Sequence, residues 1–311
     1  MRKALLLSAV AAMFLFSCKK EHSAPVKPGP KMYKVTFNMA SQFAQTINAL
    51  KTSKQQTNSL QVDSATTNIA SYAPVIILGI FNSNGILVRK IVQNAGDVSN
   101  FGVIVDSLAT GTYSVVAVAG QSGVTLDFNN AAEEIYSVFY TSAIRTYSPW
   151  SDTFYDEFPL TITNGPVNQS VPLTRLVGKV EVDFNDIIPA NASRLDIELN
   201  KEDFLYFTAT ASLAQPDTIT YHLTVPDSVK GTSNYKVSEL VLNIATPFSV
   251  ILTAYDASNN IIATHTVTNV TCAKNQRTIL TGNFSSTSTN TGTNFNITVN
   301  PSWGTPNIIH Y

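Results

Sequence analysis

The chain has 311 residues, of which 44% are hydrophobic and 13% charged, and its formal net charge is −1. This length is enough for a sizeable core and favours two domains over one, while the aromatic content excludes global disorder. A near-neutral chain lacks the excess of basic residues that binding to nucleic-acid phosphates requires, which argues against a nucleic-acid partner. Two cysteines are too few for a scaffold held together by disulfide bonds.

The N-terminus predicts a secreted lipoprotein. Arg2 and Lys3 precede an apolar run over residues 4–16, which is too short for a permanent membrane span but suits a signal peptide. The run ends in Leu15-Phe16-Ser17-Cys18, which resembles the bacterial lipobox. The small serine gives the signal peptidase access to the bond, and the cysteine thiol accepts diacylglycerol. We therefore expect cleavage before Cys18 and anchoring through two or three acyl chains such as palmitate.

The mature chain is expected to begin with a tether and to continue as two domains. Residues 18–31 include the segment Ser23–Pro30, whose prolines and glycine prevent regular structure, so this stretch should be extended. The turn Asn164-Gly165-Pro166 ends one strand pattern before the next begins. The predicted division is a signal peptide over 1–17, a tether over 18–31, and β-domains over 32–172 and 173–311.

Strands dominate the predicted first domain. Alternating apolar residues predict a strand over 33–39, and residues 42–73 read as a long polar loop. Asn-Gly between two apolar runs predicts a hairpin of 76–81 with 86–92. After a further strand over 101–105, residues 112–120 are β-rich and apolar on both faces, as in a central strand. A short helix is predicted over 130–140.

The second half repeats this style. Period-two patterns predict strands over 179–184, 194–200 and 240–244, each with one buried face. Residues 248–255 should pair with 261–267 across Ser258-Asn259-Asn260, and 295–299 should form the last strand. Short strands without alternating helices predict antiparallel β-sandwiches.

The order of several segments resembles one known family. The lipobox and tether are followed by Lys34–Phe37, by Leu108–Ala117, by Val171–Val182 and, more weakly, by Asn275–Phe284. Together they resemble the fimbrillin-A-associated anchor lipoproteins of Bacteroidetes type V fimbriae, over nearly the whole mature chain. The resemblance implies two transthyretin-like antiparallel β-sandwiches, no enzymatic activity and no cofactor. It also implies a cell-adhesion role in a surface fibre, at the outer membrane.

The same resemblance bears on the place of the subunit in a fibre. Pilins of that group are cleaved after an arginine in the N-terminal segment, but no arginine lies between Arg2 and Arg89. This favours an untrimmed anchor or accessory subunit over a stalk pilin. Fimbrillin or other fimbrial subunits are the expected partners, and they can associate by adding a strand to an open sheet edge.

The alternative is a surface glycan-binding lipoprotein of a polysaccharide-utilisation system. An aromatic-dense stretch could stack on sugars, although aromatic residues more often serve burial; it comprises Tyr136, Phe139, Tyr140, Tyr147, Trp150, Phe154 and Tyr155. No metal site or catalytic nucleophile is predicted from the acids, histidines and cysteine. Asp152, Asp156 and Glu157 lack EF-hand spacing, His222 and His265 lack ligand-spaced neighbours, and Cys272 is expected to be buried.

One modification site is expected in the first polar loop. Asp63-Ser64-Ala65 resembles the three-residue O-glycosylation sequon of Bacteroides-type bacteria, as do three other Asp-Ser/Thr tripeptides. Ser64 is the best candidate of the four because its loop should be exposed.

Overall fold

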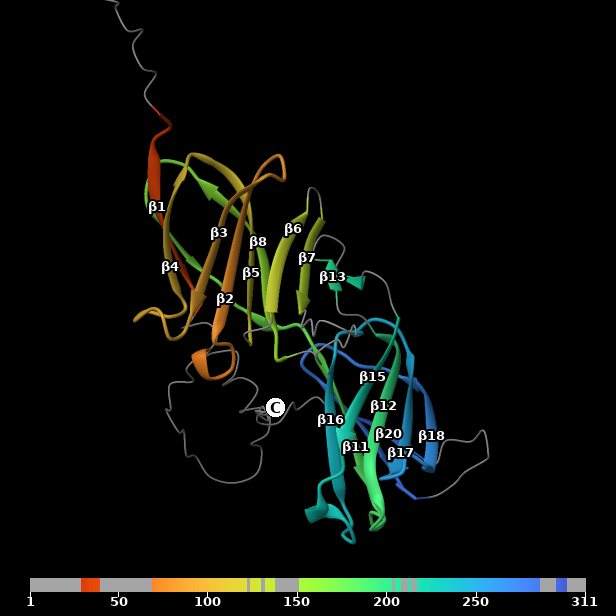
Figure 1. The fold of residues 1–311 in the computed structure, drawn as a ribbon. Helices are drawn as coiled ribbons and strands as arrows, with labels where there is room; N and C mark the ends of the chain where they lie inside the picture. Colours follow the sequence, from red (N-terminus) through yellow and green to blue (C-terminus); the bar gives the residue numbers. More distant parts are fainter. Residues whose placement is uncertain are drawn as a thin grey trace, which may run out of the picture. The chain divides into compact units, whose positions relative to one another are not determined.

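The computed structural model describes residues 29–39, 69–121, 124–129, 132–137, 151–202, 205–207, 212–213, 217–285 and 295–300. These residues form β-strands arranged in five sheets (Figure 1). Within them the helical elements are two single 3₁₀ turns, η1 (Ile69–Ser71) and η2 (Asp227–Val229). None of these described segments is a helix long and apolar enough to cross a membrane. The prediction of an all-β sandwich protein is confirmed.

The first sandwich packs a three-stranded sheet against a five-stranded sheet. The smaller sheet has the order β4 (Val103–Ala109), β1 (Met32–Asn38), β9 (Val167–Ser170). The larger has the order β10 (Thr174–Arg175), β8 (Phe154–Ile162), β5 (Gly111–Gly120), β2 (Val75–Asn82), β3 (Leu87–Asn94). Alternate residues such as Val35 and Phe37 are fully buried between the sheets. This agrees with the period-two pattern of the sequence, which predicted that every second side chain faces the core.

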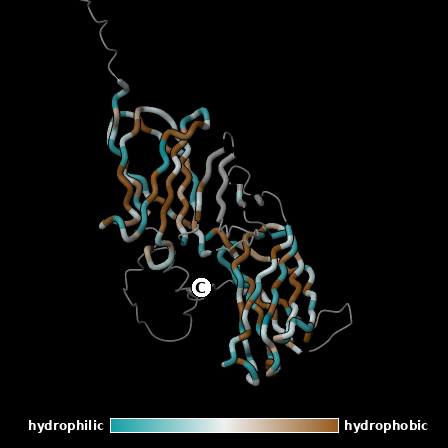
Figure 2. The backbone as a smooth tube through the Cα atoms, viewed as in Figure 1, coloured by the Kyte–Doolittle hydropathy of each residue, from teal (hydrophilic) through white to brown (hydrophobic). Residues whose placement is uncertain are grey.

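The second sandwich is built from two four-stranded sheets. One has the order β16 (Tyr235–Val241), β11 (Gly178–Phe184), β19 (Arg277–Gly282), β20 (Asn296–Asn300). The facing sheet has the order β15 (Asp217–Thr224), β12 (Ala192–Glu202), β17 (Phe248–Asp256), β18 (Ile261–Val270). Val180, Val182 and Phe184 point into the core between them. Figure 2 shows hydrophobic residues alternating with polar ones along the strands of both sandwiches.

The two sandwiches share one topology. Strands β1, β2, β3, β4, β5, β8 and β9 pair with one another in the same way as β11, β12, β15, β16, β17, β18 and β19. Each sandwich includes one parallel pair, β1 with β9 and β11 with β19, while the other pairs within these two sets are antiparallel. The period-two pattern carries no information on strand direction, so these parallel pairs are a finding of the structure.

Both sandwiches carry a short insertion, and the insertions pair with each other. The first contributes β6 (Val124–Asn129) and β7 (Ala132–Ser137), and the second contributes β13 (Leu205–Phe207) and β14 (Ser212–Leu213). They form one sheet, β14-β13-β7-β6, in which β7 pairs antiparallel with β13. The helix predicted over 130–140 is therefore wrong for residues 132–137. Cross-strand pairing overrides the helix propensity of its Ala and Glu residues.

A third apolar cluster covers the outer face of the five-stranded sheet. Ile77, Val116 and Val118 lie on this face, and residues of the second half of the chain, including Leu176 and Leu242, pack against them. The central strand β5 is consequently buried on both faces, as its sequence predicted.

The observed strands confirm some of the predicted ones and correct others. The hairpins β2–β3 and β17–β18 and the last strand β20 are confirmed. The strand predicted over 240–244 is wrong in its bounds, because β16 begins at Tyr235 and ends at Val241. Strand β15 was not predicted, although Ile219, Tyr221 and Leu223 alternate in it with polar residues.

Candidate functional site

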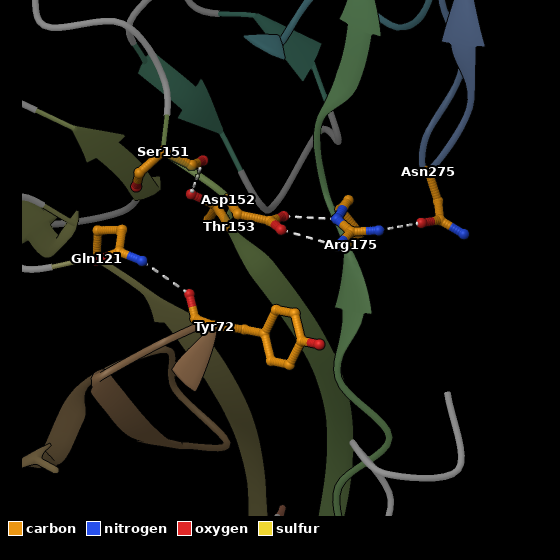
Figure 3. A network of polar contacts seen from close by, with 7 residues as sticks. All are labelled: Tyr72, Gln121, Ser151, Asp152, Thr153, Arg175 and Asn275. Carbon is orange, nitrogen blue, oxygen red and sulfur yellow. Dashed lines mark hydrogen bonds and ion pairs between the residues drawn. The ribbon is translucent and has the colours of Figure 1, made fainter. Parts of the chain in front are cut away.

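A buried arginine joins segments from both halves of the chain. Arg175, on β10, is 2% exposed. Its Nε and Nη2 donate to the two carboxylate oxygens of Asp152 at 2.5 and 2.8 Å, and its Nη1 donates to Oδ1 of Asn275 at 2.6 Å (Figure 3). The guanidinium carbon also lies 5.0 Å from the centre of the Phe154 ring. The planar guanidinium suits this set, because its donors match a carboxylate bidentately while its face stacks on an aromatic ring.

Backbone hydrogen bonds join the same segments on either side of Arg175. The amide of Leu176 donates to the carbonyl of Thr153, and the amide of Asn275 donates to the carbonyl of Val177. Asn275 adopts a left-handed conformation with φ of 57°, which asparagine tolerates better than most residues. The cluster is a structural joint: it connects Asp152 and Arg175 to Asn275, which lies 100 residues after Arg175 in the sequence. Both carboxylate oxygens of Asp152 accept hydrogen bonds from Arg175, so the cluster has the character of a structural contact and not of a ligand site.

Strand edges are the other feature with functional potential, because an unpaired edge can receive a strand from another chain. We use the word opening for a side of a sandwich where the edge strands of its two sheets face each other. The order of the sheets gives each sandwich two openings: β3/β4 and β9/β10 in the first, and β15/β16 and β18/β20 in the second.

The β3/β4 opening is sealed by polar side chains. Arg89 Nε lies 3.4 Å from Asp106 Oδ2, and both residues belong to the inner faces of their edge strands, opposite Ile80 and Val35 respectively. Gln93 adds a second bridge, since its side chain donates to the carbonyl of Val103 and accepts from the amide of Gly102. Inward-pointing charges of this kind prevent edge-to-edge association.

The β9/β10 opening is closed by the chain itself. Val171 and Leu173 cross it between β9 and β10 and are fully buried. Asp156 of β8 also faces inward here, opposite Ala117, and burial raises its pKa to about 6.

The β15/β16 opening contains a buried carboxyl group. Glu239 of the edge strand β16 faces the core opposite Val180 and is only 5% exposed. Desolvation by burial raises the pKa of Glu239 from 4.5 to about 7. Within the described part of the chain this carboxyl group makes no hydrogen bond or ion pair.

The β18/β20 opening differs from the other three. His265 of β18 packs edge-on against Phe295, with ring centres 5.3 Å apart, and its Nε2 lies 3.2 Å from the carbonyl oxygen of Phe284. Ile297 and Val299 of β20 follow Phe295 and pair with the buried Leu280 and Thr278, which places them on the inner face. They are nevertheless 40% and 49% exposed.

The residues predicted for lipidation and glycosylation are not described by the structure. Leu15, Phe16, Ser17 and Cys18 and the loop residue Ser64 all lie outside the described ranges. The prediction that Cys272 is buried is confirmed: it is 7% exposed and burial raises the pKa of its thiol to about 12. Such a thiol is not a nucleophile at neutral pH.

The described acids and histidines form no metal site. Within the described ranges no group of three or more His, Cys, Asp or Glu residues could hold a metal ion. His222 Nδ1 lies 2.7 Å from Asp196 at the surface, and His265 is buried, with its Nε2 beside the carbonyl oxygen of Phe284. In the aromatic-dense stretch Phe154 is fully buried, and Tyr155 donates a hydrogen bond to Glu157. Phe139, Tyr140, Tyr147, Trp150 and the side chain of Tyr136 lie outside the part of the chain that the structure describes.

Sequence reasoning missed Arg175 and Glu239. An isolated arginine after a proline-containing turn gives no local signal, because its partners lie 23 and 100 residues away. Glu239 did carry a signal, since it occupies the apolar phase of a period-two pattern with Val237 and Val241.

The family model described as "Fimbrillin-A associated anchor proteins Mfa1 and Mfa2" matches residues 46–308. A search of curated proteins finds no match.

Solved structures resemble the fold at low identity. A candidate polysaccharide-binding protein from Bacteroides thetaiotaomicron has a TM-score of 0.53 at 11% identity, with 87% of this chain and 96% of that chain covered. A candidate adhesin from the same organism has a TM-score of 0.51 at 11% identity, covering 89% and 98%. A candidate adhesin from Bacteroides ovatus has a TM-score of 0.51 at 9% identity, covering 87% and 92%. At such identities the likeness shows the fold.

Proposed function

The chain belongs to the family of fimbrillin-A associated anchor proteins, and from this membership we propose that it is a fimbrial anchor or accessory subunit held in the outer membrane by a lipid on Cys18. The observation that carries the proposal is the family match over residues 46–308, which includes most of both sandwiches. The fold supports it, because a two-sandwich protein with unpaired sheet edges can act as a binding module without any catalytic group. We propose no enzymatic role.

We further propose that partner subunits attach by strand addition. Main-chain hydrogen bonds between an incoming strand and a sheet edge supply affinity, and alternating side chains set the register. The expected partners are fimbrillin or other fimbrial subunits, on the cell surface.

The role in fibres is tested by deleting the gene for this protein. Loss of an anchor should release fimbriae into the medium, so the ratio of shed to cell-bound fimbrillin should rise, and the gene supplied in trans should restore it. Fimbriae that remain bound and unchanged in amount and length after the deletion would contradict an anchor or accessory role.

Lipid anchoring is tested with one substitution and a matched control. Cys18→Ala removes the only acceptor thiol of the lipobox and should move the protein from the membrane fraction to a soluble one. Ser17→Ala keeps a small residue before the cleavage site and should leave the protein in the membrane fraction. If Cys18→Ala stays membrane-bound and the unaltered protein carries no acyl mass, the lipid proposal fails.

Two finer proposals accompany this role. The chain divides into a signal peptide over 1–17, a tether over 18–31 and domains over 32–172 and 173–311, and Ser64 is O-glycosylated. A glycan mass on the peptide that contains Ser64, from protein made in its own cells, tests the second; an unmodified peptide removes it. Glycan binding as the main function is the weaker alternative, because the family match is to fimbrial anchor proteins.

A further inference from the structure

We propose that the β18/β20 opening of the second sandwich is the docking site for an extended segment of a fimbrial subunit, which adds as a strand to the edge of β18. The inference rests on the fimbrial role proposed above and names the edge at which that role is performed. Four independent features of the described residues lead to this edge.

The first feature is the sequence of β18 itself. It spans ten residues without a charged residue or a proline, and between two register shifts in its pairing with β17 it forms a regular ladder over residues 263–267. Solitary proteins protect long edges with such residues. The edge strand β3 carries Arg89 and Lys90, and β16 carries Lys236 and Glu239. The regular stretch over residues 263–267 carries no charged residue and no proline and is therefore suited to pairing with an added strand.

The second feature is the distribution of inward carboxyl groups. Each of the other three openings has one on an inner face: Asp106 at β3/β4, Asp156 at β9/β10 and Glu239 at β15/β16. Strands β18 and β20 contain no aspartate or glutamate. An added strand would have to desolvate a carboxyl group at the first three openings, but not at β18/β20.

The third feature is the repeat between the two sandwiches. Strand β8 of the first sandwich corresponds to β18 of the second, and β8 pairs along its outer edge with β10, through Thr174 opposite Tyr155 and Arg175 opposite Phe154. The corresponding edge of β18 has no strand in the described part of the chain. The first sandwich therefore shows, within the same molecule, that a strand fits at this position of the fold.

The fourth feature identifies the chemistry of the occupant. Ile297 and Val299 face inward from β20 but are 40% and 49% exposed, and among the described residues the facing sheet ends at β18 without a further strand to cover them. A strand added to β18 would extend that sheet over these two side chains. The side chains that it points inward should be apolar, and those that it points outward would lie beside the exposed Thr264 and Thr266 of β18. The occupant is therefore an extended segment with apolar residues at every second position.

Site-specific cross-linking tests the location of the contact. A photoreactive phenylalanine analogue is placed at Thr266 on β18 or, as the matched control, at Thr220, an exposed threonine on the edge strand β15. The full-length protein is made in its own fimbriated cells and irradiated. We expect fimbrial-subunit peptides attached at position 266 and none at position 220. Cross-links at 220 but not at 266, or at neither position, would overturn the proposal.

A charge placed in the opening tests its importance. Ile297→Asp combined with Val299→Asp introduces inward carboxylates, and Val105→Asp introduces one on the outer face of β4, where the side chain is 56% exposed. With unchanged melting temperatures, the double variant should retain about tenfold fewer cell-bound fimbriae, since an unpaired charge in a contact must be desolvated. The Val105 variant should retain the normal amount.

The results separate this inference from the function on which it rests. If deleting the whole protein releases fimbriae but the double variant holds them normally, the protein is an anchor and the β18/β20 opening is not its docking site. If the deletion releases nothing, both proposals fail.

Discussion

Glu239 should make the stability of the second sandwich depend on pH in a direction opposite to that of most carboxyl groups. It lies on the inner face of β16, is 5% exposed, and has a pKa raised by burial from 4.5 to about 7. Between these two pH values the unfolded chain ionises Glu239 while the folded chain keeps it protonated. The group therefore contributes stability that is fully present below pH 4.5 and is lost as the pH rises through about 7.

The size of the effect follows from the two pKa values. A difference between 4.5 and about 7 corresponds to about 3 kcal/mol in the free energy of unfolding. Glu239→Gln removes the titration but leaves an amide in the same place. Its absolute stability also reflects the cost of burying that amide, about 1–3 kcal/mol if no partner is found, so the change with pH is the informative quantity.

Urea unfolding followed by circular dichroism at pH 5, 6, 7 and 8 provides the measurement. We expect Glu239→Gln to reduce the loss of stability between pH 5 and pH 8 by about 2–3 kcal/mol relative to the unaltered protein. Asp156, whose pKa is also raised by burial, is present in both proteins and cancels. Glu198→Gln, on the outer face of the facing sheet, controls for the loss of one negative charge. Identical pH dependence in the Glu239 variant and the unaltered protein would refute the reasoning.

Three further predictions concern buried contacts. Arg175→Met should lower the free energy of unfolding by about 3–5 kcal/mol in urea titrations, because it leaves the Asp152 carboxylate without its partner; a loss below about 1 kcal/mol would contradict the role of this joint. Gly282→Ala should cost about 1–3 kcal/mol and speed amide exchange in β20, since its Cβ would lie 2.6 Å from the ring of Phe295; unchanged exchange would show that the ring moves freely. Cys272, with its thiol pKa raised to about 12 by burial, should react with a thiol reagent at pH 8 only after the protein unfolds; rapid reaction of the folded protein would disprove its burial.

Much of the strand pattern could be predicted because it depends on local alternation. Val180, Val182 and Phe184 were expected to share a buried face, and they do. The two hairpins were predicted from turn residues between apolar runs, since turn geometry is also local. The helix prediction was wrong for residues 132–137 because their conformation does not depend on local sequence alone. They form a strand by pairing with β6 and with β13, and β13 comes from a distant part of the chain.

The candidate site was less accessible to sequence reasoning. Nothing near Arg175 in the sequence indicates that Asp152 and Asn275 will surround it. Likewise, the alternation of Ile297 and Val299 with polar residues predicted a strand with one apolar face, but it could not indicate that the structure leaves both side chains 40% and 49% exposed.

The sequence by itself determined the class of the fold, the positions of most strands and the resemblance to fimbrial anchors, because these depend on period, turn chemistry and short motifs. Only the tertiary structure decided which strands became edges and which inner faces stayed uncovered. Strands β17 and β18 both contain an alternating stretch, over residues 248–254 and 263–267, yet among the described residues β17 is paired on both sides and β18 on one. The difference arises because a strand's hydrogen-bonding partners are set by the order in which the whole chain packs, and alternation along one strand does not encode that order.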